Sequence, residues 1–215
     1  MKSIICYNPD IMGNTVGSQK NLTKLQQQIL IGGLLGDTCL EQNGRNTRLR
    51  IEHGLRQEQY LRWKYEKFAS IATSVPRLTG SKSRGKLYQR WHISSFSIPQ
   101  LNEYREKFYR DKRKIVPKDI GSLLVSPISL AVWFMDDGYK RNDCNALRIS
   151  TDCFSVKENS LLQKCLKDNF GIASALHKKG KVWNIYIPKD NALKFCKIIR
   201  SYVIPDLEYK IALTP

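Results

Sequence analysis

The sequence predicts an α+β protein made of two pseudo-symmetric αββαββα halves. Two nine-residue blocks, LIGGLLGDT at 30–38 and LAVWFMDDG at 130–138, are apolar runs that end in acidic residues. The eighth residues of the blocks, Asp37 and Asp137, lie 100 positions apart. After each block the chain shows alternating apolar and polar residues, typical of strands, and then a helical period. The same order occurring twice indicates a duplicated unit.

In the first half, residues 1–120, the apolar block is expected to form the first helix. The turn dipeptide Asn43-Gly44 predicts a hairpin directly after this helix. The elements expected in this half are a motif helix at 24–37, strands at 38–42 and 47–53, a helix at 57–72, strands at 75–80 and 86–94, and a helix at 98–110.

The second half, residues 121–215, repeats this order after a connecting segment at 111–126. Ser155 followed by Glu158 three positions later is a capping-box pattern that marks a helix start. The elements expected here are a motif helix at 127–137, a strand at 146–151, a helix at 155–168, strands at 172–178 and 181–187, and a helix at 190–202.

The two apolar blocks suggest how the halves join. Gly32 and Gly36 lie four residues apart, on one face of the first helix, and small residues at this spacing let two helix backbones approach closely. Parallel packing of the two helices would bring Asp37 and Asp137 together at one end. Nearby carboxylates repel one another, and a divalent cation relieves that repulsion.

The charge of the chain points to a polyanionic partner. The 36 Lys and Arg against 19 Asp and Glu give a net charge of +17, and the pI is about 9.7. Nucleic acid is the commonest partner of so basic a protein, and the alternative is a solvated basic surface. Six cysteines and three histidines show no paired spacing of the kind that binds zinc.

Period-two alternation sorts the strand residues into two faces. Leu49 and Ile51 are expected to face the core, and the polar residues between them to face outward. The outward candidates on the strands are Arg48, Arg50, Lys86, Tyr88, Arg90, His92, Arg148, Asn184 and Tyr186, and the turns add Lys82, Arg84, Lys179 and Lys181. A two-stranded ribbon fits a DNA major groove, so these side chains are candidate DNA contacts. For each of them the alternative is an ordinary solvated strand face.

The two blocks resemble the motifs of the LAGLIDADG homing endonucleases in their single-chain, two-motif form, and the WFMDDG of the second block is similar to intron-encoded members. The resemblance implies that the motif helices join the halves and that the antiparallel sheets form a DNA-binding saddle. It also implies that Asp37 and Asp137 bind divalent metal and hold the catalytic water. Thr38 replaces the usual glycine, and Val132 and Asp136 replace usual small residues, so we expect a looser helix contact there.

The resemblance also implies a basic residue beside each metal site. Lys114 precedes Ile115-Val116-Pro117, and Lys210 follows the similar Val203-Ile204-Pro205. We expect both lysines to position water and phosphate and to neutralise charge, the alternative being a plain phosphate contact or a surface lysine. For Asp136 a structural role at the helix end is favoured over a catalytic one.

The resemblance, together with the charge and the paired acids, implies a monomeric, site-specific endonuclease that hydrolyses phosphodiester bonds of double-stranded DNA with Mg²⁺, for which Mn²⁺ can substitute. It further implies that the protein leaves short 3′ overhangs and promotes homing of its intron. Two alternatives stay open: an RNA maturase with its own intron RNA as partner, and a non-cleaving DNA-binding regulator. We expect no membrane association and an intracellular location, with mitochondrion, chloroplast and bacterial cytoplasm all open. Residues 1–22 are interpreted as an irregular arm, either a DNA contact or a disordered leader.

Overall fold

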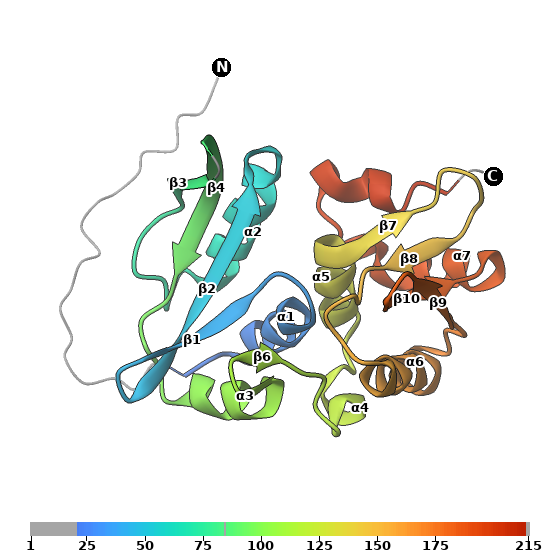
Figure 1. Ribbon diagram of the computed structural model, residues 1–215, viewed down its shortest axis with the longest axis horizontal. Helices are drawn as coiled ribbons and strands as arrows, with labels where there is room; N and C mark the ends of the chain where they lie inside the picture. Colours follow the sequence, from blue (N-terminus) through green and yellow to red (C-terminus); the bar gives the residue numbers. More distant parts are fainter. Residues whose placement is uncertain (1–20, 84, 214–215) are drawn as a thin grey trace, which may run out of the picture.

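The computed structural model describes residues 21–213 apart from residue 84. Arg84 therefore lies outside the described residues, as does all of the expected arm at 1–22 except its last two residues. In the first half the elements follow the predicted order αββαββα (Figure 1). Their bounds are α1 Lys24–Leu35, β1 Cys39–Asn43, β2 Asn46–Gly54, α2 Glu58–Phe68, β3 Arg77–Ser83, β4 Lys86–Ser94 and α3 Gln100–Phe108, with a 3-10 turn η1 at Leu55–Gln57.

The second half repeats this order after a short connection. The connection contains β5 Tyr109–Arg110, β6 Arg113–Lys114 and the short helix α4 Ile120–Leu123. The half itself consists of α5 Pro127–Asp137, β7 Gly138–Lys140, β8 Leu147–Ile149, α6 Val156–Phe170, β9 Ala175–Lys179, β10 Val182–Ile187 and α7 Lys189–Ile199, followed by the 3-10 turns η2 Arg200–Tyr202 and η3 Pro205–Lys210.

Each half holds a four-stranded antiparallel sheet with the same topology. The strand order is β1-β2-β4-β3 in the first half and β7-β8-β10-β9 in the second. Cys39 lies opposite Arg50 in one sheet, and Tyr139 lies opposite Arg148 in the other. The predicted α+β class with two pseudo-symmetric halves is thus confirmed, whereas the boundary at residues 120 and 121 stays a prediction.

The two motif helices, α1 and α5, pack against each other between the two sheets (Figure 1). A Cβ added to Gly32 would lie 2.2 Å from the carbonyl oxygen of Ser129, so the backbones are as close as a glycine permits. The Ser129 hydroxyl donates to the carbonyl of Gln28 at 2.7 Å, which ties the two helices together. The expectation of a looser contact at Val132 and Asp136 is wrong, because the glycines of α1 leave room for these larger side chains.

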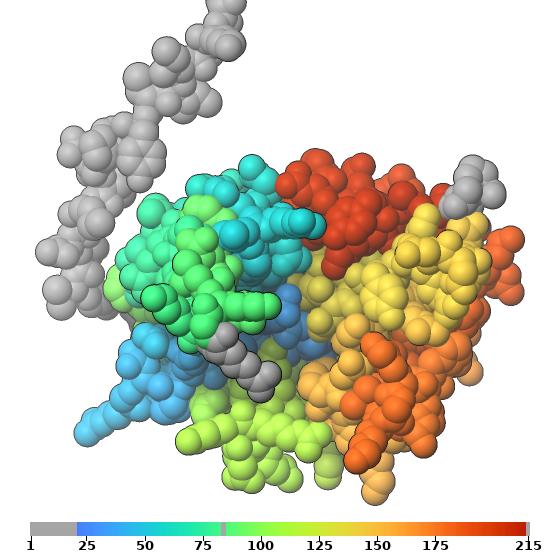
Figure 2. All heavy atoms as spheres, turned by 45° about the horizontal axis from the view of Figure 1, so that its top comes forward, coloured from blue at the N-terminus to red at the C-terminus, as the bar shows by residue number. Residues whose placement is uncertain are grey.

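The core runs continuously from one half into the other. Leu34, Leu130, Trp133 and Phe134 on the motif helices have no exposed surface, and they belong to the same cluster as the buried residues of both sheets. Figure 2 shows the halves filling opposite sides of the molecule, with atoms of the first motif segment visible in blue where they meet. Because the contact between α1 and α5 is buried in this core, the positions of the side chains at the ends of the two helices are fixed.

Several boundaries differ by a few residues from the sequence-based expectation: α2 ends at Phe68 instead of residue 72, and β3 spans Arg77–Ser83 instead of 75–80. The helix expected to reach residue 110 ends at Phe108, and a tight β5–β6 turn follows in which Asp111 and Lys112 adopt positive φ angles of 47° and 68°. Strand β7 was not expected. Among residues 21–83 and 85–213, no helix combines the length and the apolar character needed to cross a bilayer.

Candidate active site

The motif helices end where their acidic residues begin. Thr23 and Gln26 start α1 with a capping box, and Gly36 follows its last residue as the C-cap. The other helix has Pro127 in its first turn, and the hydroxyl of Ser126 makes no capping hydrogen bond. Asp37 therefore lies two residues beyond the end of α1, whereas Asp136 and Asp137 are the last two residues of α5.

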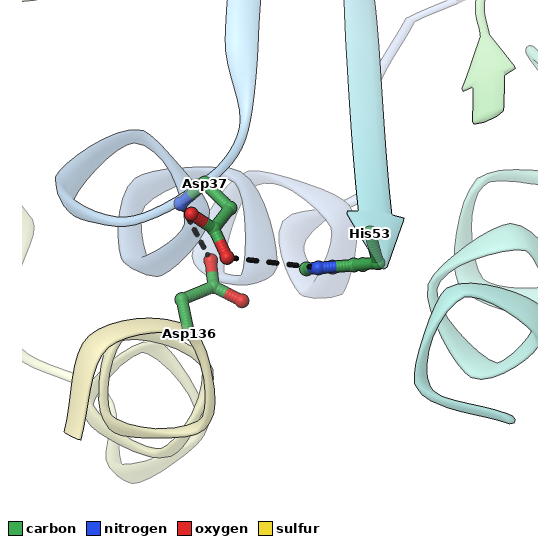
Figure 3. A group of neighbouring side chains, drawn as sticks. All are labelled: Asp37, His53 and Asp136. Carbon is green, nitrogen blue, oxygen red and sulfur yellow. Dashed lines mark hydrogen bonds and ion pairs between the residues drawn. The ribbon is translucent and has the colours of Figure 1, made fainter. Parts of the chain in front are cut away.

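Asp136 is a buried structural acid that joins the two halves. Its side chain has no exposed surface, and its Oδ1 accepts from Lys64 Nζ on α2 at 2.7 Å. Its Oδ2 accepts from the backbone N–H of Asp37 at 3.0 Å (Figure 3). A Cβ at Gly36 would lie 2.5 Å from this Oδ2, so the glycine makes room for the carboxylate.

The ionisation of Asp136 follows from these contacts. Burial opposes its negative charge, but Lys64 and the Asp37 N–H outweigh this effect and hold the pKa of the carboxyl below its usual value. The structural role favoured from the sequence fits this geometry. Both oxygens of Asp136 are occupied, and the carboxylate fixes the start of the segment that carries Asp37.

Asp37 and Asp137 occupy a less favourable environment. Burial, followed by repulsion from Asp136, raises the pKa of Asp37. Burial, followed by repulsion from Asp37 and Asp136, raises the pKa of Asp137 to about 8. Lys114 and Lys210 act in the opposite direction on both acids. Asp137 thus lies within electrostatic reach of Asp37, and added positive charge would stabilise the ionised forms of both acids.

Lys114 and Lys210 occupy equivalent places in the two halves. Lys114 Nζ donates to the carbonyl oxygen of Gly36 at the end of the first motif helix. Lys210 Nζ donates to the carbonyls of Met135 and Asp136, at 2.6 and 3.4 Å, at the end of the second. Each lysine thus anchors on carbonyls that a helix terminus leaves unpaired, next to the acid of its own half. Lys210 is only 8% exposed, and burial lowers its pKa.

The structure adds a histidine that the sequence analysis did not select. His53 ends the inward face of β2, is 3% exposed, and points its ring at Asp37, with 3.6 Å between Nδ1 and Asp37 Oδ2 (Figure 3). The sequence does contain a pattern that could have identified His53. His53 continues the alternation of Leu49 and Ile51, so a polar residue stood at a position expected to face the core.

Lys64 was missed in the same way. It follows Tyr60 by four residues and precedes Phe68 by four, on the buried stripe of α2, and is itself 1% exposed. A lysine on an apolar stripe indicates a buried anionic partner. The sequence could not identify that partner, because Asp136 belongs to the other half.

The ligand atoms of Asp37, His53 and Asp136 lie within 4.8 Å of one another, the one group of this kind among the described residues. Oxygen and imidazole donors suit divalent cations. Burial, and after it repulsion from neighbouring acids, raises the pKa of Asp37 and of Asp137, so a cation here would favour their ionised forms. The residues present therefore fit a divalent metal. Of the sequence-predicted pair, Asp37 belongs to this group and Asp137 does not.

The candidate nucleic-acid contacts of the first sheet form a network around two glutamates. Arg48 and Arg50 pair with Glu41 at 2.9 and 3.0 Å. Glu52 pairs with Arg90 at 3.1 Å and lies 3.3 Å from His92. The three arginine side chains remain 38–42% exposed, so their guanidinium groups are held in place while still accessible.

One candidate of the second sheet is corrected. Asn184 is 2% exposed, because its amide turns to the backbone of Thr151 and Trp183 instead of solvent. Tyr186 is partly buried and stacks on His177 with 4.2 Å between ring centroids, and Arg148 is likewise partly buried beside them. The remaining described candidates are all exposed: Lys82, Lys86, Tyr88, Lys179 and Lys181.

Known proteins resemble this chain over most of its length. The cytochrome b mRNA maturase bI2 of Debaryomyces hansenii is 30% identical over 206 residues, which cover 92% of this chain and 78% of the relative. The probable intron-encoded endonuclease 1 of Wickerhamomyces canadensis is 26% identical, with 98% of each chain covered.

A solved structure agrees with these relatives. The homing endonuclease I-WcaI bound to its DNA recognition sequence matches with a TM-score of 0.84 and 26% identity, over 91% of this chain and 89% of that one. The family model described as the LAGLIDADG DNA endonuclease family matches residues 27–195. This span contains most of α1, all of α5, both sheets, Asp37, Lys114 and Asp137. This chain therefore belongs to the LAGLIDADG DNA endonuclease family.

Proposed function

We propose that this protein is a site-specific endonuclease that cuts both strands of a long DNA target with a divalent metal, leaves short 3′ overhangs and promotes homing of its intron. One observation carries the proposal. Asp37 and Asp137 share one electrostatic site at the ends of paired helices, and each helix end holds one lysine on its carbonyls. The pairing gives one acid and one lysine for each DNA strand.

The residues have distinct roles in this reaction. A bound divalent ion, Mg²⁺ or in its place Mn²⁺, would supply an activated water and neutralise charge on the phosphate. Asp37 and Asp137 would hold such ions, and Asp136 fixes the backbone of Asp37 by accepting a hydrogen bond from its N–H. Lys114 and Lys210, fixed on helix-end carbonyls, direct positive charge at the phosphates and stabilise the charge that develops during cleavage.

The two sheets supply recognition in this proposal. Their outward arginines and lysines alternate at the spacing that aims side chains at base edges in a major groove. The net charge of +17 favours a long duplex footprint. The I-WcaI structure supports the arrangement, since that protein of the same fold is bound to its DNA recognition sequence. The two halves share one core, so we propose that the protein acts as a monomer.

The test is cleavage of a randomised duplex library in Mg²⁺, with sequencing of the cut ends. Asp37→Asn and Asp137→Asn should each abolish double-strand cleavage while retaining DNA binding. Lys114→Ala and Lys210→Ala should slow cleavage much more than they weaken binding. Full cutting by either aspartate variant would overturn the assignment. A loss of affinity in proportion to rate would make that lysine a phosphate anchor.

A second candidate function is RNA maturation, which the name of the Debaryomyces relative favours. Under the endonuclease proposal, specific binding runs through the sheets, and Arg90→Ala should cost about 1–3 kcal/mol on the cognate duplex and relax preference at adjacent base pairs. Lys82→Ala, near the exposed end of β3, should weaken binding to all sequences alike. Tight binding confined to the folded intron RNA would favour the maturase. A non-cleaving regulator is the least supported function, because both aspartates are present.

A further inference from the structure

His53 is a buried imidazole. Among the described residues neither ring nitrogen makes a hydrogen bond of ordinary geometry, although both are shielded from solvent; the side chain of Gln57 lies close enough to influence the charge of the ring. The nearest anionic group is Asp37, whose Oδ2 lies 3.6 Å from Nδ1, beyond ordinary hydrogen-bond distance. Unpaired buried polar groups are rare in native proteins, and such a group indicates an ion or water that completes it.

The surroundings of His53 leave its lone pair available. The ring stacks against Tyr60 with centroids 4.8 Å apart, which fixes its orientation. The buried position disfavours a charge on the ring, and the neighbouring Lys64, whose Nζ pairs with Asp136, disfavours it further. Both oxygens of Asp136 already accept hydrogen bonds, from Lys64 and from the Asp37 N–H. A neutral, oriented imidazole is the form that ligates metals.

The spacing of the two groups suits a shared ion. Ligand atoms about 2.1 Å from one ion lie about 3.0–3.5 Å apart for octahedral to tetrahedral angles. The 3.6 Å between His53 Nδ1 and Asp37 Oδ2 needs only a small side-chain adjustment to reach this range. Asp37 is 43% exposed, so its carboxylate has room to adjust and remains open to a substrate.

The other half lacks an equivalent group. In the sheets, Arg50 opposite Cys39 corresponds to Arg148 opposite Tyr139. Counting three residues on from each arginine, His53 corresponds to Thr151, whose hydroxyl donates to the carbonyl of Trp183 at 3.1 Å. The second half therefore has no nitrogen donor at this position and satisfies its polar group internally.

We infer that His53 is a nitrogen ligand of the divalent ion held by Asp37, which makes the metal site of the first half chemically different from that of the second. This inference rests on the proposed metal site at Asp37 and Asp137. Imidazole favours Mn²⁺ and later transition metals over Mg²⁺, whereas oxygen donors alone do not discriminate in this way. The site of the first half should thus prefer Mn²⁺ to Mg²⁺ more strongly than its partner.

The experiment measures Mn²⁺ bound to the full chain by electron paramagnetic resonance, with pulsed detection of nitrogen coupled to the ion. Protein labelled with ¹⁵N in histidine alone should change the frequency of this coupling, a readout that needs no substitution. His53→Leu should abolish the coupling and reduce affinity for one Mn²⁺ about tenfold or more, with a smaller effect on Mg²⁺. His177→Gln is the matched control and should retain the coupling.

The outcomes separate the inference from the function on which it rests. Mn²⁺ that depends on Asp37 but shows no histidine nitrogen coupling would overturn the inference and leave the endonuclease proposal standing. Binding of Mn²⁺ that is unchanged in both Asp37→Asn and Asp137→Asn would overturn the metal site itself. Thermal unfolding of His53→Leu should match the wild type, because replacing an unpaired buried polar group with an apolar one is nearly neutral.

Discussion

At the scale of the residue, the candidate active site is a set of acidic side chains that burial partly removes from water. Asp136 is compensated by Lys64, while Asp37 and Asp137 are left with raised pKa values. Acids in such surroundings lower the free energy of unfolding, and they attract cations. The loss of stability can be measured in the absence of metal.

The pKa of Asp137 predicts how stability depends on pH. Its folded value of about 8 lies above the ordinary value of 3.8, so between these values the folded state holds a proton that the unfolded state has lost. Stability must therefore fall as pH rises through this range, and the loss is complete above pH 8. In chelator, the stability of Asp137→Asn should exceed that of the wild type by an amount that grows from pH 5 to pH 8.

Chemical denaturation at several pH values measures this difference. Comparison with the variant is necessary because His53 acts with the opposite sign: its folded pKa of about 3 lies below its ordinary 6.5, so stability rises with pH between them. A difference between wild type and Asp137→Asn that does not change with pH would show that Asp137 is ionised throughout.

At the scale of the element, the two motif helices and α2 decide whether the halves stay together. Gly32→Ala should destabilise the protein by about 3 kcal/mol or more, the upper end of the usual overpacking cost, because its Cβ meets the Ser129 carbonyl at 2.2 Å. Gly121→Ala is the control. Its Cβ meets nothing within 4 Å, so it should be neutral or slightly stabilising. Equal urea midpoints for the two variants would contradict the close helix contact.

The Lys64–Asp136 pair links α2 of one half to α5 of the other. Lys64→Met should cost about 3–5 kcal/mol, because it leaves a buried carboxylate without a counter-charge. Asp136→Asn in the same chain should recover much of that loss, a coupling that a double-mutant cycle measures. The control is the exposed pair of Lys107 and Asp119, where Lys107→Met should cost less than about 1 kcal/mol.

Much of the element plan could be predicted from the sequence, because periodicity and caps are local. The capping boxes at Thr23 and Ser155 form as such patterns predict. Strand β7 is only three residues long, too short to show alternation, and exists through its pairing with β8. Asn184 shows the limit of alternation, since consecutive residues of β10 are buried there. The partners of His53 and Lys64 depend on how the halves dock, which no local pattern encodes.

At the scale of the whole molecule, the net charge predicts strong dependence of DNA binding on salt. Each phosphate contact by Lys or Arg contributes about −0.9 to the slope of log affinity against log salt. With contacts along two sheets we expect a slope of about −5 or steeper on the cognate duplex. Fluorescence anisotropy at several KCl concentrations measures it. A slope near −1 would contradict an extended footprint.

The close fit of Gly36 and Asp136 has an evolutionary consequence. A dimer built from two first halves would place glycine opposite glycine and bury two Lys64 side chains with no carboxylate to neutralise them. A dimer of two second halves would force two aspartates into space that now admits one. The two halves are therefore complementary, and not interchangeable, at this contact. A recombined protein that takes one half from a relative must still place a glycine at position 36 opposite an aspartate at position 136.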